Sequence, residues 1–126
     1  MKILLVDDDP ELLKCLSESL DCHGYTTSQF ADSAKALEAY KSENFDVVIS
    51  DYRMPGMDGL ELLKKIRSYD PEASLIMITG TVDLYSAIEA VNSGARGFHL
   101  KPLKMGELLA SLDMIENQIN CSRRHQ

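Results

Sequence analysis

The chain has 126 residues, 44% of them apolar and 26% charged, a composition typical of one globular domain with a buried core rather than of a disordered chain. Twenty acidic residues outnumber thirteen basic ones and give a net charge of −7, whereas a surface that binds nucleic acid must be basic. We therefore expect a single domain that makes no direct contact with nucleic acid.

The hydrophobic pattern alternates between short apolar runs and longer stretches with helical spacing. In chain order, we predict strands at residues 3–6, 25–30, 47–49, 75–78 and 97–100. Each strand is followed by a predicted helix, and the buried faces of the five helices are these: Leu12, Leu13, Leu16 and Leu20; Ala34, Leu37 and Tyr40; Leu60, Leu63 and Ile66; Leu84, Ile88 and Val91; and Leu108, Leu112, Ile115 and Ile119. Strands that alternate with helices are typical of βα units on a parallel sheet.

Turn residues agree with three of these boundaries. Asp9-Pro10 predicts the capped start of the first helix, and Asp58-Gly59 predicts the turn into the third. Ser93-Gly94 predicts the end of the fourth helix, because glycine tolerates the positive φ found there.

The predicted strands differ in polarity. Residues 3–6, 47–49 and 75–78 are apolar on both faces, as central parallel strands covered by helices are. The run at 25–30 is half polar and the run at 97–100 contains His99, so we place both at the edges. The prediction is an α/β fold of the flavodoxin-like, doubly wound class: a five-stranded parallel sheet of order 2-1-3-4-5 with helices on both faces. Ligands of such sheets bind at the carboxyl ends of the strands, beside the point between strands 1 and 3 where the order reverses.

Three carboxylates follow the two strands at that point. Asp7 and Asp8 come directly after the first strand, and Asp51 follows the third. Adjacent parallel strands lie ~4.8 Å apart, so these side chains must converge, and their charges repel unless a cation compensates. Oxygen ligands without His or Cys favour Mg²⁺, which keeps coordination positions for a phosphoryl oxygen. The sequence therefore predicts a Mg²⁺ site suited to phosphate chemistry.

Two more polar residues end neighbouring strands. Thr79 follows the fourth strand, where its hydroxyl can bind a phosphoryl oxygen, and Lys101 follows the fifth, where its ammonium can neutralise a transferring phosphoryl group. Taken alone, Thr79 would be a strand-end residue and Lys101 a surface lysine. Residues 7–9 stand where a glycine-rich phosphate loop would follow the first strand, which excludes an ordinary nucleotide-binding site.

Five short motifs stand in order at the predicted strand and helix ends: LVDD at 5–8, DYRMPGMDG at 51–59, ITG at 78–80, GA at 94–95 and KP at 101–102. Each is weak alone, but together they span nearly the whole chain and resemble the receiver domain of response regulators in two-component signalling, which has a CheY-like fold. On this resemblance we assign residues 1–121 to the receiver domain and 122–126 to a tail or the start of a linker.

The resemblance implies how phosphate is accepted. Asp51 takes a phosphoryl group from a sensor histidine kinase or a phosphotransfer protein. Asp8 binds Mg²⁺ directly, Asp7 binds it through water, and Arg53 contributes its backbone carbonyl. Beyond its own phosphorylation and dephosphorylation, the domain is not expected to be an enzyme.

The resemblance also implies how the signal is read. Thr79 moves toward the phosphoryl group, and Phe98 turns inward into the space vacated, although Phe98 could simply be a core residue. Lys101 pairs with the phosphate, positioned by a cis peptide bond to Pro102. Partner binding then changes on the face formed by the fourth helix, the fifth strand and the fifth helix.

Three departures from the family pattern matter. The switch aromatic is often tyrosine, and Phe98 keeps the ring without the hydroxyl. The side chains two residues after the acceptor and after the threonine tune phosphate lifetime; here they are Arg53 and Thr81, neither a carboxylate nor an amide, so we predict slow self-dephosphorylation. No Lys or Arg lies between residues 83 and 93, which argues against a homodimer held by salt bridges on the fourth helix.

Two other functions stay open. A haloacid-dehalogenase-like phosphohydrolase would use Asp7 as nucleophile, with Thr79 and Lys101 as later motifs. Pro10-Glu11 does not fit that family's first motif, no acidic pair follows Lys101, and the chain is short for that fold. The second alternative is a receiver that docks to its partners independently of phosphorylation.

Cysteine usage and hydropathy bear on location. Cys15 and Cys22 lie seven residues apart on one predicted helix, with Cα atoms roughly 10 Å apart, too far for a disulfide, and Cys121 is left over. No signal peptide or apolar run of ~20 residues is seen. We expect a soluble, cytoplasmic protein without membrane contact.

The chain could be a stand-alone regulator or the N-terminal piece of a longer protein with an output domain. We favour the second interpretation.

Overall fold

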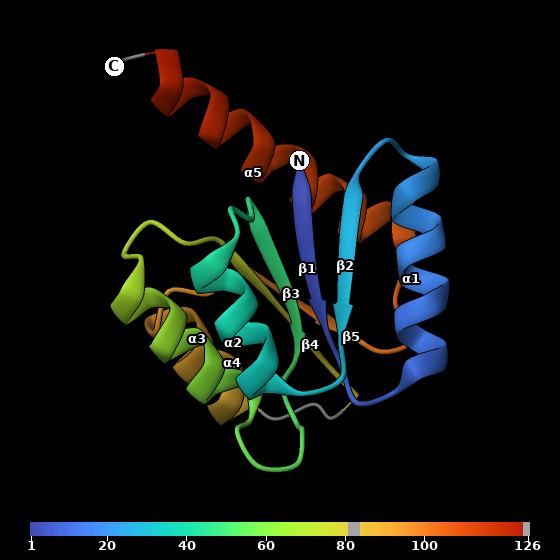
Figure 1. The fold of residues 1–126 in the computed structure, drawn as a ribbon, viewed down its shortest axis with the longest axis vertical. Coiled ribbons are helices and arrows are strands. Elements are labelled where there is room, and N and C mark those ends of the chain that lie inside the picture. The colour runs from blue at the N-terminus through green and yellow to red at the C-terminus, as the bar shows by residue number, and fades with distance from the viewer. Residues whose placement is uncertain (81–83, 125–126) are drawn as a thin grey trace.

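The computed structural model describes residues 1–80 and 84–124, which form a parallel sheet with helices on both faces (Figure 1). The strands are β1 (Lys2–Val6), β2 (Thr26–Phe30), β3 (Val47–Asp51), β4 (Leu75–Thr79) and β5 (Gly97–Leu100). The helices are α1 (Pro10–Cys22), α2 (Ser33–Ser42), α3 (Gly59–Tyr69), α4 (Leu84–Asn92) and α5 (Met105–Arg124). The strand order is β2-β1-β3-β4-β5, which confirms the predicted fold class and topology.

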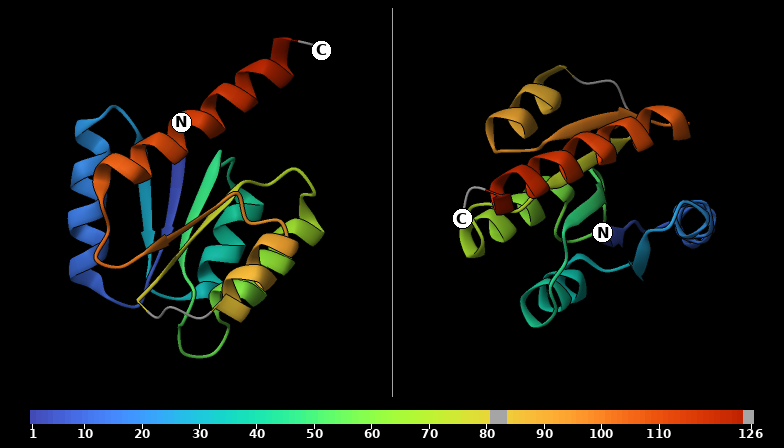
Figure 2. Two further views of the ribbon diagram at one scale, coloured as in Figure 1. Left: turned by 180° about the vertical axis from the view of Figure 1, so that it is seen from behind. Right: turned by 90° about the horizontal axis from the view of Figure 1, so that it is seen from above.

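Alternate residues of the central strands pack against different helices. On β1, Leu4 and Val6 face the core shared with α2, α3 and α4, whereas Ile3 and Leu5 face the core shared with α1 and α5. Figure 2 shows α5 crossing the sheet on the side that carries α1. The doubly wound arrangement thus leaves both faces of the sheet covered and its carboxyl edge open to solvent.

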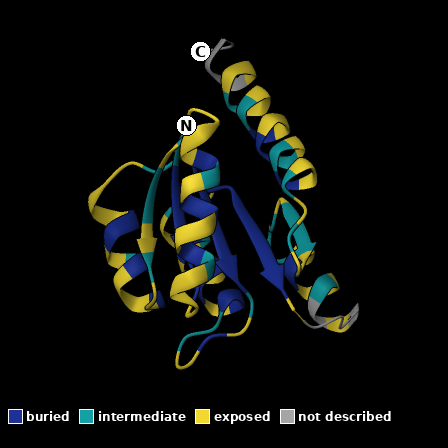
Figure 3. Cartoon of the chain, turned by 90° about the vertical axis from the view of Figure 1, so that its right-hand side faces the viewer, coloured by how far each residue is buried: buried dark blue, intermediate teal, exposed yellow. Residues whose placement is uncertain are grey.

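Burial separates the central strands from the edge strands (Figure 3). All five residues of β3 and of β4 are buried, and so are four of the five in β1. Neither β2 nor β5 contains a buried residue. This confirms the edge positions predicted from the polar residues in these two strands.

The structure confirms the predicted starts of α1 and α3. The Asp9 carboxylate accepts the N–H groups of Glu11 at 3.0 Å and Leu12 at 3.4 Å, with Pro10 as the first helical residue. Asp58 caps α3 by accepting the Glu61 N–H at 2.9 Å. Such caps contribute about 1 kcal/mol each and fix where the chain turns from the loop into the helix.

The predicted inward face of α4 is wrong. Ile88 is 52% exposed and Val91 is 60% exposed, whereas Ala90 is buried. The side chain of Leu84 lies outside the part that the structure describes. Six of the nine residues of α4 are apolar, so hydrophobic spacing alone does not select one face, and the helix packs through its smaller residues. The same ambiguity affects α2, where Ala34 is exposed and Ser33, Ala36 and Ala39 are buried beside Tyr40.

Two strands run further than predicted. β3 ends at Asp51 and β4 at Thr79, so both candidate site residues are the last residues of buried strands. The Tyr52 N–H still donates to the Ile78 carbonyl at 2.7 Å, which continues the β3–β4 pairing past Asp51. The main chain is therefore paired with β4 at Asp51 and also at the residue after it.

The last helix crosses the predicted domain boundary. α5 continues to Arg124, past residue 121, and the division at that residue stays a prediction. Among the described helices, none combines the length and the apolar character that a membrane span requires.

Candidate functional site

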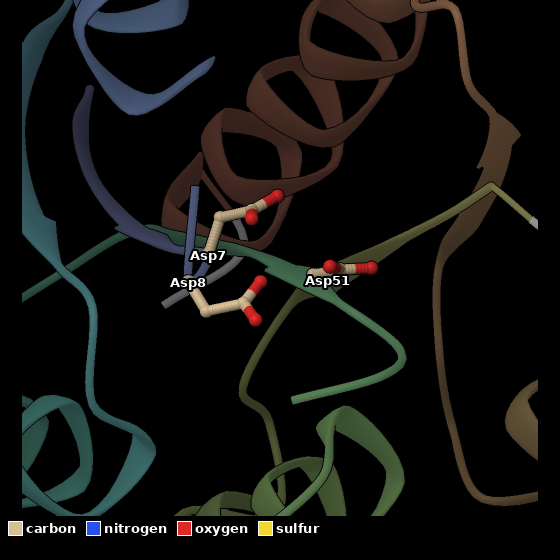
Figure 4. Close-up of side chains that lie close together, drawn as sticks. All are labelled: Asp7, Asp8 and Asp51. Carbon is tan, nitrogen blue, oxygen red and sulfur yellow. The ribbon is translucent and has the colours of Figure 1, made fainter. Parts of the chain in front are cut away.

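Three acidic side chains meet at the carboxyl ends of β1 and β3. One carboxylate oxygen from each of Asp7, Asp8 and Asp51 lies within 4.8 Å of the others (Figure 4). Asp7 and Asp51 are buried, and Asp8 is exposed. The neighbouring positions of β1 and β3 bring them together, because Val6 pairs with Ser50 in the sheet.

Both oxygens of Asp7 are engaged. Its Oδ1 accepts the Asp9 N–H at 2.9 Å, and its Oδ2 accepts a hydrogen bond from Lys101 Nζ at 3.1 Å. Burial raises the pKa of Asp7 above its ordinary value, and the charge of Asp51 adds to this, while the Asp9 N–H and Lys101 act in the opposite direction. Asp7 is thus fixed in place by its own loop and by the lysine.

Lys101 joins the two buried carboxylates. Its Nζ lies 3.1 Å from Asp7 Oδ2 and 3.2 Å from Asp51 Oδ2, and the side chain is half-buried. Burial lowers the pKa of Lys101, but the hydrogen bonds and charges of Asp7 and Asp51 outweigh burial and raise it above its ordinary value. The group is therefore an ammonium ion, and its peptide bond to Pro102 is cis, as the resemblance implies.

Thr79 lies on β4, which pairs with β3, and Phe98 lies on β5, the edge strand beyond β4. Thr79 is 3% exposed at the end of β4, and its carbonyl accepts the Lys101 N–H at 2.8 Å, so these two residues are neighbours. Phe98, on β5, is half-buried and packs against the core on the α2, α3 and α4 side. It thus packs at the margin of the core, and its role as a switch stays a prediction.

Arg53 lies in the loop after β3 with its side chain exposed. It lines an open cavity of about 400 Å³ with Met54, Pro55 and Asp58, directly beyond Asp51. The role of its carbonyl as a metal ligand stays a prediction. Thr81, the other residue expected to tune phosphate lifetime, lies outside the described residues.

The donor set at this edge fits Mg²⁺. The three carboxylates offer oxygen ligands only, and in residues 1–80 and 84–124 they form the one group of three acidic, His or Cys side chains close enough to share an ion. Lys101 offsets one of the three negative charges. The excess negative charge and the hard oxygen donors match a small divalent cation.

The sequence did not indicate every residue that builds this site. Asp9 was predicted only as a helix cap, yet its N–H also holds Asp7. Main-chain donors carry no side-chain signal, so spacing alone could not find this contact. Gly59 was predicted as a turn residue and as the end of the motif at 51–59, and the structure also places it directly against the main chain of Asp51.

Two features define a receiver-type signalling domain: the order of the strands, and the acidic groups with a lysine at the carboxyl edge of the sheet. The family model for the response regulator receiver domain matches residues 3–113, and the chain belongs to this family. Receiver domains are signalling modules that use Mg²⁺ at an acidic pocket and pair with histidine kinases or phosphotransfer proteins. This membership removes the basis for the hydrolase alternative.

Three similar proteins illustrate the relationship. The transcriptional regulatory protein DctD of Rhizobium meliloti is 39% identical over 116 residues, which are 92% of this chain and 25% of DctD. The DNA-binding transcriptional regulator NtrC of Escherichia coli is 39% identical over 111 residues, which are 88% of this chain and 24% of NtrC. The chemotaxis protein CheY4 of Vibrio cholerae superposes with a TM-score of 0.85 at 32% identity, over 90% of this chain and 97% of CheY4. The chain thus spans about a quarter of the length of the two transcriptional regulators.

Proposed function

We propose that this receiver domain is switched by transfer of a phosphoryl group to Asp51 from a sensor histidine kinase or a phosphotransfer protein. The observation that carries the proposal is the contact of one ammonium group, Lys101 Nζ, with both Asp7 and Asp51. Asp51 is a buried carboxylate with a cation beside it, at the edge of the sheet where a phosphate ligand is expected.

The transfer forms one bond and breaks one. An oxygen of the Asp51 carboxylate attacks the phosphorus atom and forms an acyl phosphate, and the phosphorus–nitrogen bond to the donor histidine breaks with its electron pair returning to the imidazole. Lys101, already 3.2 Å from Asp51, neutralises charge on the phosphoryl oxygens. The hydroxyl of Thr79, at the end of the next strand, donates a hydrogen bond to one of those oxygens.

Asp7, Asp8 and Asp51 are the side chains that would hold Mg²⁺, together with the backbone carbonyl of Arg53. Bound there, Mg²⁺ supplies positive charge that offsets the acid groups and binds phosphoryl oxygens. The family resemblance implies that Asp8 would bind the ion more directly and Asp7 through water, and both oxygens of Asp7 already accept hydrogen bonds from protein groups.

The phosphorylated state is read on the face formed by α4, β5 and α5. Phosphorylation adds about two negative charges at the rim of the sheet, and Thr79 and Phe98 respond to them. This face has several exposed apolar side chains, which favour a protein partner. They are Tyr85, Ile88, Val91, Leu100 and Met114.

Self-dephosphorylation is slow in this proposal. The side chain two residues after the acceptor belongs to Arg53, which is exposed and carries no carboxylate or amide to orient an attacking water. A timed decay assay of the acyl phosphate tests this. Persistence for many minutes is expected, and loss within seconds contradicts it.

The similar proteins suggest what this receiver domain controls. DctD and NtrC are transcriptional regulators with about three quarters of their length outside the match. We propose that this receiver likewise controls an output domain, or a second copy of itself, in the cytoplasm.

Intact mass spectrometry after incubation with acetyl phosphate and Mg²⁺ tests the proposal. The wild-type domain should gain one phosphoryl group, and Asp51→Asn should gain none. Asp9→Asn is the matched control, since asparagine also caps a helix and Asp9 lies beside the cluster; it should be modified like the wild type. Modification that persists in Asp51→Asn contradicts the proposal. If the affinity for a partner is the same with and without beryllofluoride, an acyl-phosphate mimic, phosphorylation-independent docking is favoured instead.

A further inference from the structure

Gly59, the first residue of α3, lies directly against the main chain of the acceptor strand. A Cβ atom added to Gly59 would overlap the carbonyl oxygen of Asp51 and would lie 2.9 Å from Tyr52 Cα and 2.8 Å from Met77 Sδ. The Gly59 N–H donates to the Tyr52 carbonyl at 2.8 Å, which maintains the close approach. Two of the three neighbours are main-chain atoms, so no side-chain rotation relieves the overlap.

Glycine is needed at position 59 because there is no room for a Cβ atom, and not because of the backbone conformation. Gly24, Gly56 and Gly94 have positive φ, whereas Gly59 does not. Alanine could therefore adopt the backbone conformation of Gly59, and the only obstacle is the strand beneath it.

The strand cannot easily move away from α3. Asp51 is paired with Ile78 of β4, and the Tyr52 N–H binds the Ile78 carbonyl at 2.7 Å. The hydroxyl of Ser50, which is fully buried, donates to the Asp51 carbonyl at 3.0 Å. The Asp51 carbonyl thus accepts a hydrogen bond from Ser50 and lies so close to Gly59 that no Cβ fits between them.

The carbonyl and the carboxylate belong to the same residue, so moving one redirects the other. The Asp51 carboxylate must stay 3.2 Å from Lys101 and close to Asp7, which the Asp9 N–H fixes independently on the first loop. The relative position of the acid groups is therefore set by where the Asp51 main chain lies.

We propose that Gly59 and Ser50 are positioning residues for the acceptor: they clamp the Asp51 carbonyl and so aim the carboxylate at Lys101 and the acidic cluster. The inference rests on the proposed function, in which Asp51 carries the phosphoryl group. In reactions that depend on orientation, a misplacement of about 1 Å can lower the rate by about 100-fold.

Two other glycines of the chain provide matched controls. Gly106, near the start of α5, has no atom within 4 Å of an added Cβ, so Gly106→Ala introduces alanine into a helix without a clash. Gly56 lies in the loop before α3 with φ +77° and open space, so Gly56→Ala strains that loop without pressing on Asp51.

The measurement is the rate of phosphorylation by acetyl phosphate at saturating Mg²⁺, divided by the folded fraction from circular dichroism. We expect Gly59→Ala to lower this rate at least about tenfold. Gly56→Ala should lower the stability while its rate per folded molecule stays near that of the wild type. Gly106→Ala should change neither quantity. A purely structural role for Gly59 would lower stability but leave the rate per folded molecule unchanged.

Several outcomes decide the proposal. A folded Gly59→Ala with the wild-type rate overturns it. If Gly59→Ala does not fold, Ser50→Ala decides the question. A phosphorylation rate reduced by at least about threefold supports the clamp, and an unchanged rate overturns it. Wild-type protein that is not modified, or is modified in Asp51→Asn, refutes the proposed function instead, so the two failures are distinguishable.

Discussion

The acceptor strand and the opposite edge of the sheet differ in how firmly they are packed. All five residues of β3 are buried, whereas β5 has no buried residue and α4 exposes Tyr85, Ile88 and Val91. An ion pair between Lys64 and Glu89, at 3.7 Å, joins α3 to α4, and such an exposed pair contributes about 0–1 kcal/mol. The proposed acceptor thus lies on one of the most deeply buried strands, and the proposed response lies on the least buried part of the sheet.

The largest effect expected from this contrast is on stability. Ile49→Ala, in β3, should lower the free energy of unfolding by about 2–5 kcal/mol, because Ile49 is 1% exposed and the change leaves a cavity. Val91→Ala, in α4, should change it by about 0.5 kcal/mol or less, because Val91 is 60% exposed. Urea unfolding of both variants measures the difference. Equal losses would contradict the contrast between the two regions.

A second effect concerns the reaction. Lys101→Met keeps the length of the side chain and removes the charge that contacts Asp7 and Asp51. We expect phosphorylation by acetyl phosphate to slow by about 100-fold, as for the loss of one charge-stabilising donor. Lys104→Met, at an exposed lysine three residues further on, is the control and should react like the wild type. An undiminished rate in Lys101→Met would show that the ammonium plays no part in transfer.

The smallest effect is a pH dependence on the weakly packed side. His99, on β5, is half-buried and its Nε2 lies 2.9 Å from Ser111 Oγ on α5. Burial lowers the pKa of His99 below 6.5, against a small opposite effect of Glu107. As pH falls below 6.5, the unfolded chain binds a proton at this residue before the folded chain does, so stability falls. His99→Gln should flatten the stability profile in this window, as measured by thermal unfolding, and an unchanged slope would assign the dependence to other groups.

The sequence predicted the sheet order because its central strands are apolar on both faces and its edge strands are not. It predicted the meeting of Asp7, Asp8 and Asp51 for the same reason, since strand order alone brings those strand ends together. It failed on α4, where apolar residues on more than one face leave the inward side undetermined.

The contacts that refine the site could not be predicted. The Asp9 N–H on Asp7 and the Gly59 backbone against Asp51 depend on main-chain atoms that every residue has. Only the three-dimensional path of the chain reveals them.

Residue mapping of the phosphoryl group tests the central claim most directly. Borohydride reduction of the phosphorylated domain converts an aspartyl phosphate to homoserine, which tandem mass spectrometry locates in the sequence. We predict conversion at position 51 and at no other aspartate. Conversion at Asp7, or none at Asp51 in a fully modified sample, would contradict the account.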